Sequence, residues 1–324
     1  MPRWRLLARG ALGAAAVSTG IAYAVMHRGH VKPTVFDMHG KTALITGGNS
    51  GIGKQAAIAL ARGGARVLVA ARSPQRGSAA VDEIRVASGN DQVELVILDL
   101  ASMASVRSAA DEILRRVDRL DVLVNNAGVT VGSRQETEDG FEMTFAVNHL
   151  GPFLLTNLLL PLLEKSAPAR IINVSSLAHK GGQLNLQDLM WENRPFVGLQ
   201  VYATSKLCNV LFTRDLARRL DGVGVTANCL HPGTIRSGFG HDDESGLLMR
   251  VGVRIAGPLF LDEERGAATT VFLAGDPSIE GVTGGYFWRG QLTDPAPAAL
   301  DEQLARGLWQ ASEQLVGLDA GVSA

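Results

Sequence analysis

The sequence predicts a single α/β domain built on a doubly wound parallel sheet, and three observations predict it. From residue 41 onwards, short runs of Val, Ile, Leu and Ala alternate with longer amphipathic stretches. A glycine-rich turn separates the first apolar run from the first amphipathic stretch. No Pro- or Ser-rich linker interrupts the alternation. Nearly continuous apolar runs are typical of strands buried on both faces of a parallel sheet, with helices between them.

Each element follows from this alternation. The expected strands are 42–46, 66–71, 93–98, 122–125, 170–174 and 225–230, with a short further strand at 285–287. The expected helices are 51–62, 74–87, 102–117, 137–165, 203–220 and 262–273, with a closing helix at 300–315. Ligands of such sheets bind outside the carboxyl ends of the strands, so the residues that follow each strand are the candidates for function.

Composition narrows the function classes. The chain has 324 residues and 46% hydrophobic residues, enough for a large core. Its net charge is -1 without a long like-charge run, so no nucleic-acid-binding face is predicted. Cys208 and Cys229 lie in apolar stretches without a CxxC or metal-ligand spacing. We expect both to be small buried core residues, and we expect no metal site.

The first predicted strand leads into a glycine-rich turn, TGGNSGIG at 46–53, which opens a helix. Such a turn lets the backbone approach a pyrophosphate, and the helix N-terminus adds N–H groups and a positive dipole end. A Rossmann-type dinucleotide site is therefore predicted. Its expected cofactor-binding residues are Gly47, Asn49, Ser50, Gly51, Ile52, Gly53 and Lys54.

The end of the second strand predicts which dinucleotide binds. An Asp or Glu that accepts from the ribose 2′-hydroxyl is typical of NAD sites at this position. Here the strand ends in Ala70-Ala71-Arg72, with Lys54 just after the glycine turn. Because guanidinium and ammonium groups pair with a 2′-phosphate, the sequence favours NADP(H) over NAD(H). The alternative is that Arg72 and Lys54 are ordinary solvated surface cations.

A candidate proton-transfer pair comes later in the chain. Tyr202 and Lys206 are four residues apart and share one helix face. A free tyrosine has a pKa near 10, and a neighbouring ammonium group lowers it. Polar or Gly residues also end the other strands: Asp99-Leu100, Asn125 to Gly128, Ser175-Ser176, and His231-Pro232-Gly233. We expect all of them at one crevice, where Tyr202 acts as general acid/base.

These motifs, in this order, resemble the short-chain dehydrogenase/reductase family over residues 41 to about 290. The stretches 137–163, 166–179, 225–233 and 308–318, with the N-terminal segment, resemble its retinol dehydrogenase branch more narrowly. The resemblance implies that Lys206 lowers the pKa of Tyr202 and holds the nicotinamide ribose. Ser176 would hydrogen-bond the substrate oxygen, and Asn148 would hold a water that extends the proton relay.

The same resemblance implies further cofactor contacts. Asp99 and Leu100 would contact the adenine, Asn126 and Gly128 would line the cofactor cleft, and Pro232, Gly233 and Thr234 would border the nicotinamide. Ser237 stands five residues after Pro232, where family members often carry Thr, and it keeps a hydroxyl at that position.

The expected reaction interconverts an apolar aldehyde or ketone with its alcohol, and the resemblance favours reduction of all-trans-retinal to retinol. Two apolar segments, 184–197 and 246–261, are expected to flank the substrate. Ordinary packing is the alternative for both, and contact with a membrane surface is a further one for 246–260. Alternative activities are reduction of lipid aldehydes, steroids or xenobiotic carbonyls. An alternative outside the enzymes is a non-catalytic NADP(H)-binding scaffold on a membrane.

Residues 1–32 form a separate segment before the domain at 33–324. Arg3, Arg5 and Arg9 precede an uncharged run at 10–26, and no acidic residue occurs before Asp37. A membrane anchor is favoured. A signal peptide cleaved near Ala22-Tyr23-Ala24, a mitochondrial targeting segment and a disordered tail are the alternatives. We expect the endoplasmic reticulum membrane with the domain facing the cytosol, or else the mitochondrial inner membrane. Related folds often pair through the helices that correspond to 137–165 and 203–220, and such pairing would make this chain a homo-oligomer.

Overall fold

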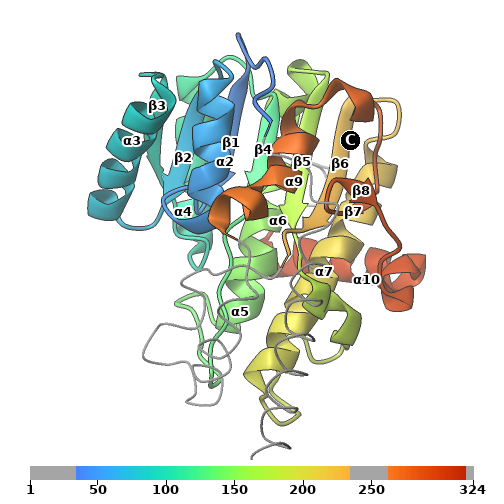
Figure 1. Ribbon diagram of the computed structural model, residues 1–324. Helices are drawn as coiled ribbons and strands as arrows, with labels where there is room; N and C mark the ends of the chain where they lie inside the picture. Colours follow the sequence, from blue (N-terminus) through green and yellow to red (C-terminus); the bar gives the residue numbers. More distant parts are fainter. Residues whose placement is uncertain (1–33, 234–261, 319–324) are drawn as a thin grey trace, which may run out of the picture.

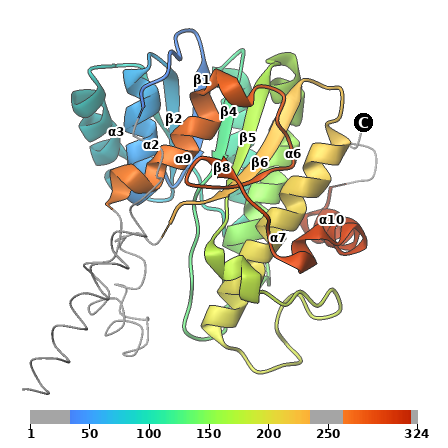
Figure 2. The same ribbon diagram turned by 45° about the vertical axis from the view of Figure 1, so that its right-hand side comes forward.

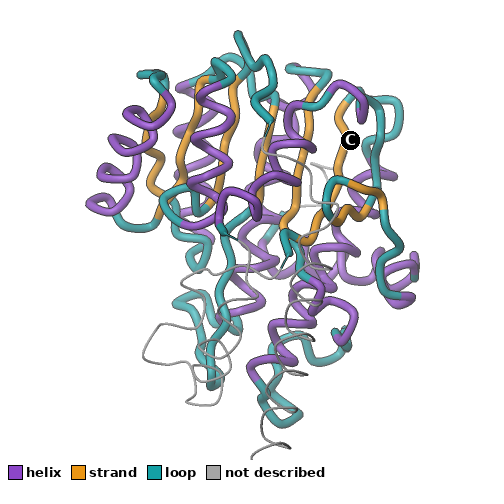
Figure 3. Tube along the Cα trace, viewed as in Figure 1, coloured by secondary structure: helices purple, strands orange, loops and turns teal. Residues whose placement is uncertain are grey.

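A sheet of eight strands lies between two helical layers in the computed structural model, which describes residues 34–233 and 262–318 (Figures 1 and 3). The strand order is β3-β2-β1-β4-β5-β6-β7-β8. All neighbours are parallel except the last pair, which is antiparallel. The strands are β1 (Thr42–Thr46), β2 (Arg66–Ala71), β3 (Val93–Ile97), β4 (Val122–Asn125), β5 (Ala169–Val174), β6 (Val225–His231), β7 (Tyr286–Trp288) and β8 (Gln291–Leu292).

The strand order reverses between β1 and β4. The chain moves outward from β1 to β3, then returns to the middle and continues outward from β4 to β8. Loops leaving β1 and β4 therefore diverge and open a crevice at their carboxyl ends. The predicted doubly wound sheet is confirmed.

Helices cover both faces of the sheet. One layer holds α2 (Gly51–Arg62), α3 (Pro74–Ser88) and α9 (Glu263–Gly275). The other holds α4 (Met103–Arg116), α6 (Gly151–Lys165) and α7 (Gly198–Arg219), with α10 (Glu302–Val316) beside α7 (Figure 2). Shorter pieces are α5 (Met143–Phe145), a π turn η1 (Ala146–Leu150), and 3-10 turns η2 (Leu177–Gly181), η4 (Pro277–Ile279) and η5 (Pro297–Leu300).

Each helical layer encloses its own core against the sheet. The α4–α6–α7 side buries Phe153, Leu154 and Leu207, and Trp309 of α10 packs edge-on against Phe153 at 4.9 Å. The α2–α3–α9 side buries smaller residues such as Ala56 and Ala267. Cys208 and Cys229 are both buried and free, as predicted.

Two helix predictions were wrong at their starts. The helix expected from 137 begins only at Met143, because Thr137 to Phe141 form a turn in which Gly140 has φ 81°. The Glu142 carboxylate then caps α5 by accepting from Thr144 and Phe145 N–H. The helix expected from 203 begins at Gly198 instead, so Tyr202 lies inside its first turns.

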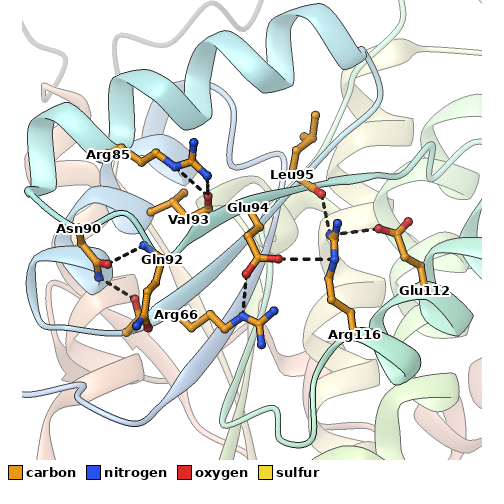
Figure 4. A network of polar contacts seen from close by, with 10 residues as sticks. Arg66, Arg85, Asn90, Gln92, Val93, Glu94, Leu95, Glu112 and Arg116 are labelled. Carbon is orange, nitrogen blue, oxygen red and sulfur yellow. Dashed lines mark hydrogen bonds and ion pairs between the residues drawn. The ribbon is translucent and has the colours of Figure 1, made fainter.

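Arginine side chains cover the outer edge of β3, which has no neighbouring strand on that side within residues 34–233 and 262–318 (Figure 4). Arg85 donates to the Val93 carbonyl at 2.7 Å, and Arg116 donates to the Leu95 carbonyl at 2.8 Å. Glu94 lies between Arg66 and Arg116, and the hydrogen bond from Arg66 lowers the pKa of its carboxyl. Charged groups on an edge strand discourage pairing with another chain.

One helical stretch among the described residues, Met143–Lys165, is long and apolar enough to cross a membrane. Its apolar window is 78% buried inside the fold, as expected of a core helix. The predicted anchor at 1–32 lies outside the described residues. Pairing of chains through α6 and α7 stays a prediction.

Candidate active site

A cleft of about 540 Å³ opens at the carboxyl edge of the sheet and receives residues from the ends of β1 to β6. Its lining consists of Thr46, Gly47, Asn49, Ser50, Gly51, Ile52, Ala70, Ala71, Arg72, Leu98, Asp99, Leu100, Asn126, Ala127, Gly128, Val129, Met143, Val147, Val174, Ser175, Ser176, Leu177, Tyr202, Lys206, His231, Pro232 and Gly233. Most of the residues predicted from strand ends therefore meet in one place. Gly53, Lys54 and Asn148 are not among the lining residues, and Thr234 and Ser237 lie outside the described residues.

The glycine-rich turn at the start of α2 forms one wall of the cleft. Gly47 and Gly51 have φ of 64° and 55°, a region that L side chains rarely adopt. A Cβ on Gly53 would lie 2.5 Å from the Gly47 carbonyl oxygen, so only glycine lets the helix approach the turn this closely. Ser50 makes no side-chain cap to the helix, and the first turn holds no acidic residue. The N–H groups at this helix end suit an anionic phosphate.

Thr46 and Asn126 fasten this turn to the end of β4. The Thr46 hydroxyl accepts from the Asn126 and Ala127 N–H groups at 3.0 and 3.1 Å. The Asn126 carboxamide donates to the Thr46 carbonyl at 2.9 Å. Sequence reasoning named Asn126 but not Thr46 as a site residue. The only signal for Thr46 was its place at the head of the glycine motif.

The two cations predicted to select the cofactor lie in different settings. Arg72 is exposed, lines the cleft, and forms no ion pair with the described part of the chain. Lys54 instead pairs with Glu83 of α3 at 2.9 Å. Because its charge is already matched, Lys54 is the weaker candidate for a phosphate contact.

Tyr202 and Ser176 join their hydroxyl groups by a hydrogen bond at the β5–α7 side of the cleft. Burial raises the pKa of Tyr202, and the hydrogen bond to Ser176 opposes this rise only in part. The Lys206 ammonium lies 5.6 Å from the centre of the Tyr202 ring and donates to the Val174 carbonyl at 3.0 Å. Burial therefore decides the direction of the Tyr202 shift, and the expected lowering of this pKa by Lys206 stays a prediction. Burial lowers the pKa of Lys206 itself to about 8.

The two adjacent serines have different neighbours. The Ser175 hydroxyl is buried and donates to the Lys206 carbonyl at 2.8 Å, which anchors β5 to α7. Ser176 begins η2, accepts from the Ala178 N–H at 3.2 Å, and reaches Tyr202. The structure therefore brings the predicted serine, Ser176, to the predicted tyrosine.

Asn148 lies in the π turn behind the cleft. Its carboxamide accepts from the Val129 N–H at 2.7 Å and donates to the Val129 carbonyl and the Ser205 hydroxyl, both at 2.9 Å. A Cβ on Gly128 would lie 3.2 Å from the Lys206 ammonium and 3.3 Å from the Asn148 amide oxygen. Gly128 thus leaves room for Lys206 and Asn148 to approach one another. Because the Asn148 carboxamide already has protein partners, its water-holding role stays a prediction.

Part of the apolar lining comes from residues that sequence reasoning did not select. They are Val129, Met143, Val147 and Leu177. None of the apolar residues predicted from 184–197 lines the cleft, so that expectation was wrong. Leu184, Leu186, Leu189 and Met190 pack on the core instead, and Trp191 is buried beneath the Arg194 guanidinium. The second predicted segment, 246–261, lies outside the described residues.

The end of β6 completes the cleft. Pro232 and Gly233 line it as predicted from the sequence motif, and so does His231. The His231 ring stacks on Trp288 of β7, with ring centres 6.3 Å apart. Among the described residues, no cluster of His, Cys, Asp or Glu could hold a metal ion.

Known proteins resemble this chain in sequence and in fold. The sequence profile described as short chain dehydrogenase matches residues 41–246. Retinol dehydrogenase 14 of Mus musculus is 47% identical over 295 residues, which cover 87% of this chain and 87% of that protein. Retinol dehydrogenase 13 of Homo sapiens is 43% identical over 323 residues, which cover 97% of each.

A solved structure also resembles the chain. The active-site complex of Pseudomonas aeruginosa RhlG with NADP is 29% identical, has a TM-score of 0.63, and matches 78% of this chain and 96% of that one. The glycine turn, the cleft and the paired Ser176 and Tyr202 hydroxyls agree with these similarities. The chain therefore belongs to the short-chain dehydrogenase/reductase family and is an oxidoreductase of the kind that uses a nicotinamide cofactor.

Proposed function

We propose that this chain is an NADP(H)-dependent reductase of apolar aldehydes or ketones, with all-trans-retinal reduced to retinol as its foremost reaction. The observation that carries the proposal is the Ser176–Tyr202 hydroxyl pair, placed with Lys206 in a cleft that also has apolar walls. The retinol dehydrogenases at 47% and 43% identity support the retinoid substrate. The RhlG complex with NADP supports the cofactor.

The residues of the cleft fit a dinucleotide phosphate. A bound NADPH supplies the hydride that reduces the carbonyl carbon. Arg72 would pair with its 2′-phosphate, because no described carboxylate neutralises this guanidinium. The other proposed contacts are Gly47, Asn49, Ser50, Gly51 and Ile52 for the pyrophosphate, Asp99 and Leu100 for the adenine, and Asn126, Gly128, Pro232 and Gly233 for the nicotinamide half.

Ser176 and Tyr202 act on the carbonyl oxygen. Both residues line the cleft, and their hydroxyl groups can donate to an oxygen on which negative charge develops. Because the pKa of Tyr202 is raised, its phenol stays protonated at neutral pH and can give the oxygen a proton. A protonated acid suits reduction, whereas oxidation of an alcohol needs the phenolate.

Lys206 supports the proton supply. Its pKa of about 8 leaves it mostly charged at neutral pH but readier to release a proton than an ordinary lysine. Asn148 and Gly128 shape the space next to the ammonium group. We propose that Lys206 also holds the nicotinamide ribose.

The test uses the full chain in mild detergent and follows NADPH absorbance with all-trans-retinal, nonanal and a steroid ketone. NADH and a Tyr202→Phe variant run alongside. Turnover of retinal with NADPH, lost in the variant, is the expected result. Turnover of nonanal or the steroid alone would keep the chemistry and reject the retinoid substrate. NADPH binding without turnover of any carbonyl would reject the reductase and favour the non-catalytic scaffold.

Attachment to a membrane through residues 1–32 is a second part of the proposal. The uncharged run at 10–26 between basic residues supports it, with the endoplasmic reticulum as the first location and the mitochondrial inner membrane as the alternative. Alkaline extraction of membranes from expressing cells should leave the full chain in the pellet and release a chain that lacks residues 1–32. Release of the full chain would contradict the anchor.

A further inference from the structure

His179, three residues after Ser176, is completely buried and uses both of its ring nitrogens. Nδ1 lies 2.7 Å from the Ser176 carbonyl oxygen, and Nε2 lies 3.0 Å from the Ala296 amide nitrogen. A carbonyl oxygen only accepts and an amide N–H only donates, so Nδ1 carries the proton and Nε2 accepts. The two partners therefore fix a neutral ring in one tautomer.

The two partners of His179 come from distant parts of the chain. Ser176 follows β5, whereas Ala296 precedes η5, 117 residues after His179. The ring also packs on Tyr286 of β7, with ring centres 4.7 Å apart. His179 thus joins the turn that carries Ser176 to the C-terminal part of the domain.

Ser176 has its backbone and side chain fixed from the same turn. Its carbonyl accepts from the His179 N–H at 3.1 Å as well as from the ring. The far end of the turn is fixed to α7, the helix of Tyr202. Gln200 donates to the Gly181 carbonyl at 2.9 Å, and the Thr204 hydroxyl accepts from the Gln183 N–H at 3.1 Å.

The turn after β5 is therefore held both at its Ser176 end and at its distal end near Gly181. The contacts of Gln200 and Thr204 hold its distal end against α7, but they leave the end that bears Ser176 to be held by other groups. The Ser175 hydroxyl fixes the end of β5 to the Lys206 carbonyl of α7, and His179 adds the link from the Ser176 carbonyl to the Ala296 amide. A group that stabilises charge on a reacting oxygen must be held within about half an ångström of its working position.

We propose that His179 is a positioning residue that holds the Ser176 hydroxyl against Tyr202 by fastening the turn after β5 to Ala296. The proposal rests on the proposed reductase function in so far as it concerns turnover. The anchoring of the turn itself can be measured without any substrate.

The kinetic test compares His179→Leu, which removes both ring bonds, with His179→Asn, whose carboxamide can still donate to the Ser176 carbonyl. His179→Leu should lower kcat/KM for the carbonyl by roughly 10- to 100-fold, since small displacements at a reacting centre are costly. NADPH affinity should change less than about twofold, because the pyrophosphate and adenine contacts lie elsewhere. His179→Asn should recover part of the loss.

A double-mutant cycle with Ser176→Ala separates positioning from general loss of structure. If His179 acts through Ser176, adding His179→Leu to the Ser176→Ala variant should lower kcat/KM by less than about threefold further. Ile113→Ala, a core truncation on the remote helix α4, is the matched control and should lower Tm without this pattern. Full additivity of the two substitutions, or a parallel loss of NADPH affinity, would overturn the proposal.

Hydrogen exchange on the intact chain gives the readout that needs no turnover. His179→Leu should speed exchange in peptides covering 175–182 and 294–300 together, whereas Ile113→Ala should leave both unchanged. Unchanged exchange in His179→Leu would overturn the anchoring. If the native chain reduces no carbonyl but the exchange result holds, the reductase function fails and the anchoring of the turn stands.

Discussion

The two halves of the cleft are built in different ways. On the cofactor half, the glycine turn and the start of α2 present backbone, and Asn126 at the end of β4, 80 residues away, holds the turn. On the proposed carbonyl half, the hydroxyl groups of Ser176 and Tyr202 form a pair, and the turn after Ser176 is linked through His179 to Ala296. The first half presents the backbone of a single sequence motif, whereas the second presents side chains from separate elements.

Because the two halves differ in this way, we expect substitutions in them to affect cofactor binding and catalytic turnover separately. Substitutions in the glycine turn should act mainly on cofactor affinity, because they alter the surface that the phosphates meet. Substitutions around η2 should act mainly on kcat, because they displace groups that matter when charge develops on the substrate oxygen. The predictions that follow test this separation, from the largest expected effect to the smallest.

Tyr202→Phe removes only the phenolic hydroxyl from the carbonyl half. We expect kcat to fall by about 10²- to 10⁴-fold, the usual contribution of a general acid. The NADPH Kd, measured by quenching of cofactor fluorescence, should stay within about twofold. A large loss of NADPH affinity would show that the two halves are not separate.

Gly53→Ala is the corresponding change on the cofactor half. The new methyl group would meet the Gly47 carbonyl at 2.5 Å, and overpacking of this kind costs about 1–3 kcal/mol. NADPH affinity should fall by roughly 10- to 100-fold, as measured by isothermal titration. Gly181→Ala, where the methyl group enters open space, is the control for cofactor affinity. Equal affinities of the Gly53→Ala variant and the native chain would contradict the account of the turn.

Arg72→Ala and Lys54→Ala test which cation selects the cofactor. Loss of a charged hydrogen bond is worth about 1.5–3 kcal/mol, so Arg72→Ala should reduce the preference for NADPH over NADH by roughly 10-fold or more. Lys54→Ala should change it little, because Lys54 pairs with Glu83. The ratio of kcat/KM values for the two cofactors is the measurement. A larger effect from Lys54 would reverse this assignment.

The pH profile of reduction tests the proton path on the carbonyl half. Tyr202, with a raised pKa, stays protonated through neutral pH, whereas Lys206 loses its proton above its pKa of about 8. If the Lys206 ammonium passes the proton on to Tyr202, kcat for reduction should be constant below about pH 7. Above about pH 8 it should fall by up to about tenfold per pH unit. A profile that stays level to about pH 10 would remove Lys206 from the path.

Glu94→Gln should have the smallest effect. This side chain pairs with Arg66 and Arg116 at the outer edge of the sheet, far from the cleft lining. Surface pairs contribute about 0–1 kcal/mol, so thermal unfolding should shift by no more than a few degrees. Cofactor affinity and kcat should match those of the native chain, and a loss of either would show coupling that the contacts do not explain.

Sequence reasoning reached most of the fold and the cofactor half because their signals are local. The apolar runs located β1 to β6 to within about one residue, and the glycine turn was recognised from its composition. The start of α7 was misplaced because Gly198 to Val201 lack a strong helix pattern, although they form the first turn of the helix.

The carbonyl half was reached less completely because its construction is not local. Ser176 and Tyr202 were identified, but nothing in the spacing of His179 and Ala296 indicates that they meet. Apolar residues at 184–197 read as a substrate lining, yet most pack on the core. Likewise, the proximity of Lys206 suggested a lowered Tyr202 pKa, whereas burial, which spacing does not reveal, raises it.

Burial of both cysteines has a chemical consequence if the chain reduces aldehydes as proposed. The whole chain contains only Cys208 and Cys229, and burial raises the pKa of both thiols. Conjugated aldehydes such as retinal are electrophiles that modify thiolates, and thiols held protonated and out of solvent are inert. The native fold would therefore expose no thiolate to the proposed substrate, and alkylation of either cysteine would report that the fold around α7 and β6 had opened.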